Sequence, residues 1–216
     1  MKVALVVGGS GLVGSYLIQE LLDNARYSRV ISLGRSLMPL KHEKLEQKIA
    51  DFDNLEPLNQ QFDDVFCCLG TTINKAGSQE NFRKVDFNYP VNVAEWALEQ
   101  GATQFILNTS MGADASSSIF YNKVKGEVEK VISSLGFRTC IIVRPSLLLG
   151  PRQEFRFGES MAKLFMGGLG FLFVGKLKKY KAIHASTVAS AMIALASMDE
   201  PGVIVYESDQ LQAFAS

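Results

Sequence analysis

The sequence predicts an α/β protein, in which a doubly wound parallel sheet carries helices on both faces. Two observations predict this fold. Short apolar runs of strand length alternate with longer segments in which apolar residues recur at helical spacing. Glycine-rich and polar clusters directly follow several of the apolar runs. Alternating strands and helices form right-handed crossovers, and ligands of such sheets bind beyond the carboxyl ends of the strands.

The expected strands and helices follow from these patterns. Val3–Val7 is continuously apolar, which is typical of a central strand buried on both faces. The full set of expected strands is Val3–Val7, Val30–Leu33, Glu46–Ala50, Asp64–Leu69, Thr103–Ser110, Thr139–Val143 and Val203–Tyr206. The expected helices contain Leu12 to Leu22, a long segment ending near Gly101, the segment from about Ser118 to Leu135, and Thr187–Ser197. Gly101 and Gly136 stand where a helix ends in a left-handed residue.

Length and charge limit the classes of function. The 216 residues fit one domain, 1–216, in which residues from about 151 onward form a small lobe on the substrate side. Basic and acidic residues number 22 each, so no long-range field favours nucleic acid or anionic membranes. The apolar segment Met161 to Val174 is shorter than the ~20 residues of a membrane span and carries Lys163.

Cysteine usage and the N-terminus indicate the compartment. The three cysteines form no disulfide framework, and Cys67 and Cys68 read as small core residues on opposite faces of a strand. No targeting segment is recognised, because Gly8 interrupts the first apolar run. We therefore expect reduced thiols in a cytoplasmic protein.

The segment Gly8 to Gly14 has glycines at G-x-x-G-x-x-G spacing, between the first strand and the first helix. Gly8 permits a tight turn, Gly11 lets the backbone approach a pyrophosphate, and Gly14 permits close helix–strand packing. Free N–H groups at the positive end of the helix then hold the phosphates. This context predicts a Rossmann-type site for a nicotinamide dinucleotide.

The second strand is followed by Gly34, Arg35 and Ser36. A site that prefers NAD(H) usually has Asp or Glu here to accept hydrogen bonds from the ribose. Arg35 instead offers a planar cation suited to a 2′-phosphate, and Ser36 a hydroxyl donor. The alternative is a surface arginine without a ligand. The sequence favours NADP(H) over NAD(H).

Tyr121 and Lys125 lie four residues apart on one face of an expected helix. That helix follows the strand whose carboxyl end carries Ser110. Carbonyl reduction needs an acid that protonates the oxygen as hydride reaches the carbon. Tyr121 could be that acid, with its ionisation favoured by the ammonium of Lys125, while Ser110 orients the oxygen. The alternative is a surface tyrosine beside a solvated lysine.

These residues resemble the short-chain dehydrogenase/reductase superfamily, and in detail its atypical branch of Tat-interacting-protein-like oxidoreductases. The most specific matching pieces are Gly9 to Gly11, Cys67 to Thr72, Ala76-Gly77, Tyr121 to Val128 and Arg144-Pro145. The chain departs from relatives with well-defined reactions in having little sequence after Gly150 for a substrate lobe. Members of this branch are also described as regulators.

The resemblance implies roles for individual residues. Ser10, Gly11, Leu12 and Val13 would touch the pyrophosphate, and Arg35 and Ser36 the adenosine phosphate. The remaining cofactor contacts would be Leu69 and Gly70 at the adenine ribose, Tyr121 and Lys125 at the nicotinamide end, and Leu148 and Arg156 closing over the cofactor. Tyr121 occupies the position of the proton donor.

The sequence therefore predicts an NADP(H)-dependent oxidoreductase that acts on a small alcohol or carbonyl compound, as a monomer or homodimer. Phe155 to Val174 combines Phe and Met with glycines, which predicts a pocket wall or lid for an apolar substrate portion; a packed helix or a partner interface is the alternative. No metal site is expected, since His42 and His184 are far apart. Two other functions remain open: a dinucleotide-sensing regulatory module, and a less favoured sugar-nucleotide epimerase or dehydratase.

Overall fold

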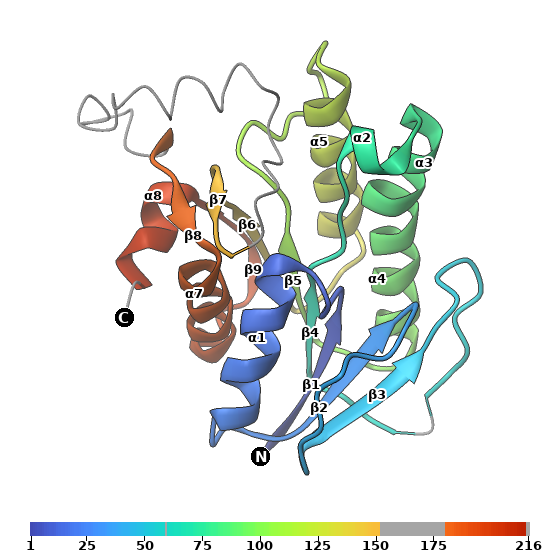
Figure 1. Cartoon of the computed structure of the whole chain (residues 1–216), viewed down its shortest axis with the longest axis vertical. Coiled ribbons are helices and arrows are strands. Elements are labelled where there is room, and N and C mark those ends of the chain that lie inside the picture. The colour runs from blue at the N-terminus through green and yellow to red at the C-terminus, as the bar shows by residue number, and fades with distance from the viewer. Residues whose placement is uncertain (59, 152–179, 215–216) are drawn as a thin grey trace.

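The computed structural model describes residues 1–58, 60–151 and 180–214. Its main sheet has seven strands in the order β3-β2-β1-β4-β5-β6-β9, and every neighbouring pair is parallel. The strands are β1 (Lys2–Val7), β2 (Tyr27–Gly34), β3 (Leu45–Ile49), β4 (Asp64–Cys67), β5 (Gln104–Asn108), β6 (Thr139–Arg144) and β9 (Gly202–Glu207). This arrangement confirms the predicted doubly wound Rossmann-type fold (Figure 1).

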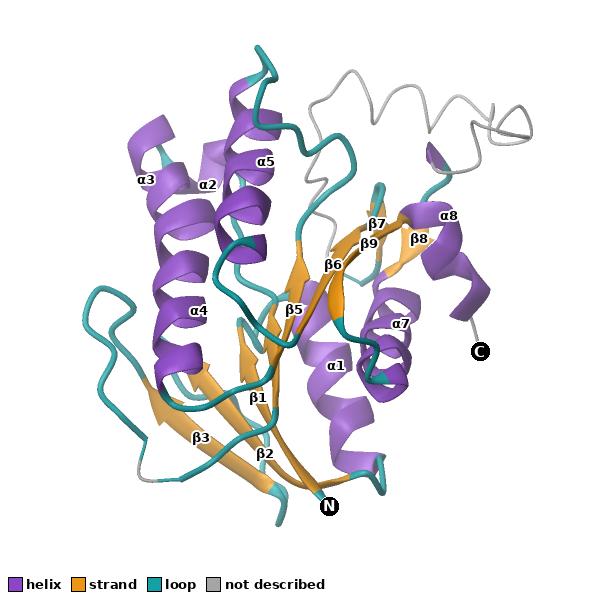
Figure 2. Ribbon diagram, turned by 180° about the vertical axis from the view of Figure 1, so that it is seen from behind, coloured by secondary structure: helices purple, strands orange, loops and turns teal. Residues whose placement is uncertain are grey.

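The long helices cover both faces of the sheet (Figure 2). One face carries α1 (Leu12–Asp23) and α7 (Ala185–Met198), and the other carries α4 (Tyr89–Glu99) and α5 (Phe120–Ser133). The shorter elements are α2 (Ile73–Ala76), α3 (Gln79–Arg83), the π-helix η1 (Lys84–Asn88), β7 (Leu148–Leu149), β8 (Ile183–His184), α8 (Ser208–Leu211) and the 3-10 helix η4 (Gln212–Phe214). Strands β7 and β8 pair with each other in a separate small sheet.

Two hydrophobic cores lie on the two faces of the sheet. Alternate residues of β1 enter different cores: Ala4 and Val6 face α1, while Leu5 and Val7 face α4. Cys67 and Cys68 also divide between the two cores, and all three cysteines are reduced and buried. The expected core role of the cysteines is confirmed.

Three connections differ from a simple strand–helix alternation. Within the described residues, no helix joins β2 to β3 or β3 to β4. The Gln47 side chain instead fixes the loop after β2: its Oε1 accepts from the backbone N–H of Met38 (2.8 Å), and its Nε2 donates to the carbonyl of Leu40 (2.8 Å). The helical segment before Gly101 is also interrupted by η1, whose wider π turn separates α3 from α4. Gly101 itself is left-handed, as expected of a helix terminator.

The C-terminal part of the chain completes the same layers. Strand β9 pairs with β6, and α7 packs against α1. The expected pocket wall at Phe155 to Val174 and the expected cofactor residue Arg156 lie outside the described residues. In the part of the chain that the structure describes, no helix is both long and apolar enough to span a membrane.

Candidate functional site

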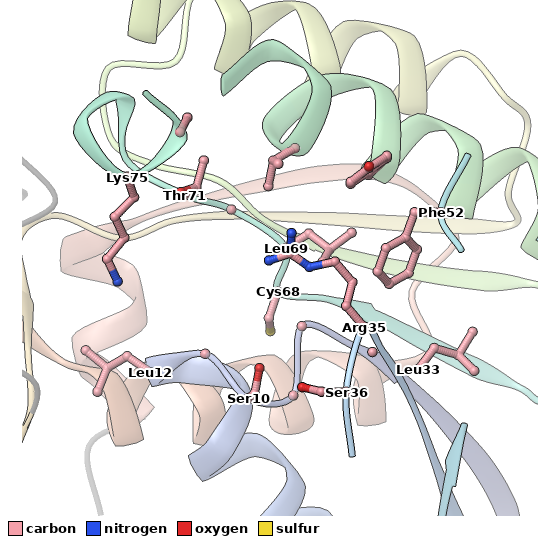
Figure 3. Close-up of a pocket in the computed structure, with 18 of the residues that line it drawn as sticks. Ser10, Leu12, Leu33, Arg35, Ser36, Phe52, Cys68, Leu69, Thr71 and Lys75 are labelled. Atoms are coloured by element: carbon pink, nitrogen blue, oxygen red, sulfur yellow. The ribbon is translucent and has the colours of Figure 1, made fainter. Parts of the chain in front are cut away.

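A cavity of about 760 Å³ opens beyond the carboxyl ends of β1, β2 and β4 (Figure 3). One wall is the turn from Gly8 to Leu12, which leads into α1. The other wall is formed by the segment after β4 with α2, together with Asn81, Lys84, Val85 and Tyr89. The sequence-predicted cofactor residues that line the cavity are Gly8, Ser10, Gly11, Leu12, Arg35, Ser36, Leu69, Gly70 and Leu148.

The glycine turn is packed so closely against neighbouring backbone that Gly8 and Gly14 could not carry a side chain. Gly8 has a φ of +82°, and a Cβ there would lie 2.6 Å from the carbonyl carbon of Cys68. A Cβ on Gly14 would overlap the carbonyl oxygen of Gly8. Gly14 therefore lets α1 start against the turn at Gly8 and Gly9, whereas the sequence predicts close packing of the helix on a strand. Such a backbone cradle can approach a phosphate closely.

The start of α1 offers backbone donors to the cavity. Its N-cap is Gly11, which provides no side-chain cap, and the first turn contains no acidic residue. The first N–H groups of a helix have no intrahelical partner and carry the positive end of the helix dipole. The Val13 side chain is buried in the core, so only its backbone can serve the predicted phosphate role, whereas Leu12 lines the cavity.

The charged side chains among the described residues that line the cavity are all cations. Among its described lining residues are Arg35, Lys75 and Lys84, and none is Asp or Glu. The Arg35 guanidinium extends into the cavity beside Leu69 (Figure 3). Lys84 forms an exposed ion pair with Asp53, with 2.7 Å between Nζ and Oδ2. This composition suits a ligand with several negative charges.

The sequence-predicted catalytic residues Ser110, Tyr121 and Lys125 are absent from the described lining of the cavity. Ser110 follows β5 and is buried, and its Oγ has no hydrogen-bond partner among the described residues. Tyr121 and Lys125 stand one turn apart in α5. The Tyr121 ring packs against Phe82, with 5.3 Å between the ring centroids.

Lys125 is buried and forms an ion pair with Asp86 of η1, with 2.7 Å between Nζ and Oδ1. The second carboxylate oxygen, Oδ2, accepts from the backbone N–H of Thr71 over 2.8 Å. Asp86 thus joins α5 to the segment after β4, which forms the cavity wall opposite the glycine turn. π turns occur often at functional sites, and this one carries the carboxylate that holds Lys125.

Asp86 was not identified from the sequence. A signal was present: Lys125 lies three residues before Val128 and seven before Ile132, so it faces the core with them. A cation at a core position needs a buried anion. Which of the 22 acidic residues provides it depends on the tertiary fold.

A second polar network ties α5 to the edge of the sheet. Arg144 of β6 donates to Glu129 of α5 and to Glu207 of β9, the latter over 3.0 Å. Glu129 also accepts from the hydroxyl of Thr109, the residue before Ser110. These contacts hold the Ser110 loop in place. In the described chain, no cluster of three His, Cys, Asp or Glu side chains could hold a metal ion.

The sequence of this chain matches a known protein family over most of its length. The family described as "NAD dependent epimerase/dehydratase family" matches residues 4–206. The chain belongs to this family. The rat protein HTATIP2 is 40% identical over 174 residues, which cover 78% of this chain and 72% of that protein. Protein FMP52, mitochondrial, of Eremothecium gossypii is 31% identical over 215 residues, covering 96% of this chain and 95% of that protein.

Solved structures with low sequence identity to this chain share its fold. Human epimerase family protein SDR39U1 (isoform 2) with NADPH has a TM-score of 0.62 and 19% identity, and the match covers 95% of this chain and 74% of that chain. MoeE5 in complex with UDP-glucose and NAD has a TM-score of 0.68 and 16% identity, covering 94% and 75%. The family match and the similarity to HTATIP2 and FMP52 confirm the resemblance to the short-chain dehydrogenase/reductase superfamily.

Proposed function

We propose that this chain binds NADP(H) in the cavity and uses it to oxidise or reduce a small alcohol or carbonyl compound. One observation carries the proposal: the cavity lies at the start of α1, its described lining has no carboxylate, and Arg35 follows β2. The family is described as NAD dependent, and the human SDR39U1 structure contains NADPH. The residues present fit a dinucleotide, because the glycine turn lines the cavity at the start of α1, whose first N–H groups have no intrahelical partner.

The proposed cofactor contacts follow the cavity. The backbone from Ser10 to Val13 holds the diphosphate, and Arg35 and Ser36 hold the 2′-phosphate. Leu69 and Gly70 border the adenine ribose. Leu148 also lines the cavity and is proposed to close over the cofactor, as the resemblance implies. Arg156 is proposed from the resemblance alone.

The bound cofactor supplies or accepts a hydride. In this proposal, Ser110 orients the substrate oxygen and Tyr121 donates the proton to it during reduction. Lys125 holds the nicotinamide ribose and supports the phenol. Two features support this assignment: the Ser110 hydroxyl has no partner within the described residues, and Tyr121 and Lys125 share one face of α5. Asp86 and the Glu129–Arg144 network position these groups.

The experiment is a panel of aldehydes, ketones and quinones incubated with enzyme and NADPH, with loss of NADPH absorbance as the readout. Sustained turnover of one compound class supports the proposal. Tight cofactor binding without turnover of any compound favours the second candidate, a dinucleotide-sensing module. A specific observation favours that candidate: the buried Asp86 carboxylate neutralises Lys125, and neither Lys125 nor Tyr121 is among the described lining residues.

The family name and the MoeE5 structure raise a nucleotide sugar as another substrate class. We propose the smaller carbonyl or alcohol substrate, with an apolar portion, over a nucleotide sugar. Adding UDP-glucose to the binding assay tests this choice, since saturable binding that depends on the cofactor would support the sugar nucleotide instead.

Compartment and assembly are part of the proposal. Three reduced cysteines favour a reducing compartment, and we propose the cytoplasm. Imaging of a tagged chain tests this, because the Eremothecium gossypii relative is named a mitochondrial protein. We also propose a monomer or homodimer, to be measured by light scattering during gel filtration.

A further inference from the structure

Lys75 projects into the cavity from the wall opposite the glycine turn. It belongs to the short helix α2, and its side chain extends from there across the cavity toward Leu12 at the start of α1 (Figure 3). Lys75 has no role predicted from the sequence, although the neighbouring Ala76-Gly77 pair is part of the family resemblance.

The backbone around Lys75 is firmly held. The Thr72 hydroxyl oxygen caps α2 by accepting from the backbone N–H of Lys75 over 3.2 Å. Gly77 ends the helix in the left-handed conformation, with a φ of +77°. The Asn81 side chain donates to the carbonyl of Ala76 over 3.0 Å. Lys75 therefore extends from a fixed base, which limits the ordering needed when it contacts a ligand.

The position of Lys75 along the cavity indicates which part of a dinucleotide it meets. Arg35 marks the adenosine end at the carboxyl end of β2. Leu12 lies close to Gly150, since a Cβ on Gly150 would lie 2.7 Å from a Leu12 methyl, and Leu148, two residues before Gly150, lines the same cavity. Lys75 lies on the side of the cavity away from Arg35 and points toward Leu12, over the first turn of α1 (Figure 3). The positive end of a helix at its first turn is where the diphosphate of a dinucleotide is expected.

We propose that Lys75 is a second diphosphate contact. Its ammonium binds the phosphates from the wall formed by α2, while the start of α1 binds them from the opposite wall. This inference rests on the proposed dinucleotide site. A diphosphate carries two negative charges, and Lys75 brings a positive charge to the lining of the cavity opposite the start of α1. The cofactor would thus bridge α1 and α2 and hold both walls of the cavity together.

The test measures dissociation constants of adenine nucleotides by calorimetry. Lys75→Met should weaken binding of NADPH and of ADP about tenfold, the effect of one charge-assisted contact. Lys75→Arg should restore most of that affinity, because the charge is what binds. Lys75 is exposed, so these variants should fold normally, and Lys123→Met is the matched control on an exposed lysine of α5 outside the cavity lining.

A fragment comparison locates the contact. The nucleotide 2′-AMP has the adenosine 2′-phosphate without a diphosphate, so Lys75→Met should leave its binding unchanged. Arg35→Met should show the reverse pattern, weakening 2′-AMP and sparing ADP. If Lys75→Met binds ADP as well as the wild type does, or loses 2′-AMP equally, the assignment of Lys75 is overturned. If the wild-type chain binds neither NADPH nor NADH, the proposed function itself fails.

Discussion

Replacing Asp86 by Asn would leave the Lys125 ammonium buried without its counter-charge. The two side chains are only 1% and 5% exposed, and 2.7 Å separates their charged atoms. Removing one partner of a buried pair costs about 3–5 kcal/mol, because the remaining charge stays desolvated and uncompensated. The asparagine oxygen can still accept from the backbone N–H of Thr71, so the loss reports mainly on the charge. For a chain of 216 residues, the melting temperature should fall by about 6–20 °C.

The assay is a double-mutant cycle measured by urea unfolding. The variants are Asp86→Asn, Lys125→Met and both together. The double variant should lose clearly less stability than the sum of the two single losses, by more than about 1 kcal/mol, since removing both charges leaves none unpaired.

An exposed pair in the same chain provides the control. Lys84 and Asp53 approach to the same 2.7 Å, but their side chains are 46% and 50% exposed. Because water already solvates both groups, Asp53→Asn and Lys84→Met should show little coupling. The reasoning is refuted if the losses at Asp86 and Lys125 simply add, or if the exposed pair couples as strongly as the buried one.

Three further results are expected. Tyr121→Phe should retain NADPH binding and lose about 10²–10⁴-fold in turnover on a verified substrate, whereas full activity would place the proton donor elsewhere. In iodoacetamide labelling followed by mass spectrometry, Cys68 should react first, because it lines the cavity while burial raises the thiol pKa of Cys67 and of Cys140 to about 12. NADPH bound in the cavity should slow the labelling of Cys68. A labelling rate of Cys68 that does not change with NADPH would contradict this prediction. Burial also raises the carboxyl pKa of Glu20, so its ionised form weakens the folded state above the unfolded-state pKa of about 4.3. Glu20→Gln should therefore raise the melting temperature at neutral pH but not below about pH 4, and an equal gain at both would count against it.

The fold could be predicted because its signals are local. The apolar run Val3–Val7, the glycines that follow it and the helical spacing after Leu12 together specify one strand–turn–helix unit. The glycines at 8 and 14 occupy close approaches, since no side chain fits at either position. Arg35 and Ser36 reach the cavity because they follow the strand that pairs with β1.

The remaining parts depend on contacts between distant residues. Nothing local in the sequence shows that Gln47 holds the loop after β2, which takes the place of a helix. The π turn of η1 could not be predicted either. It places Asp86 beside Lys125 on another helix, and that contact depends on the tertiary fold. The spacing of Tyr121 and Lys125 places both in one helix, as α5 has them. The spacing of Lys125 to Val128 and Ile132 indicates a core position, but nothing local identifies Asp86 as its partner.

Titration of NADPH and NADH into the wild-type chain tests the central claim most directly. A charge-assisted contact between Arg35 and the 2′-phosphate should make NADPH bind about ten- to hundredfold more tightly than NADH. Arg35→Asp should reverse that preference, because a carboxylate repels the phosphate and accepts hydrogen bonds from the ribose hydroxyls. Equal affinity of the wild-type chain for the two cofactors, unchanged in Arg35→Asp, would contradict the account.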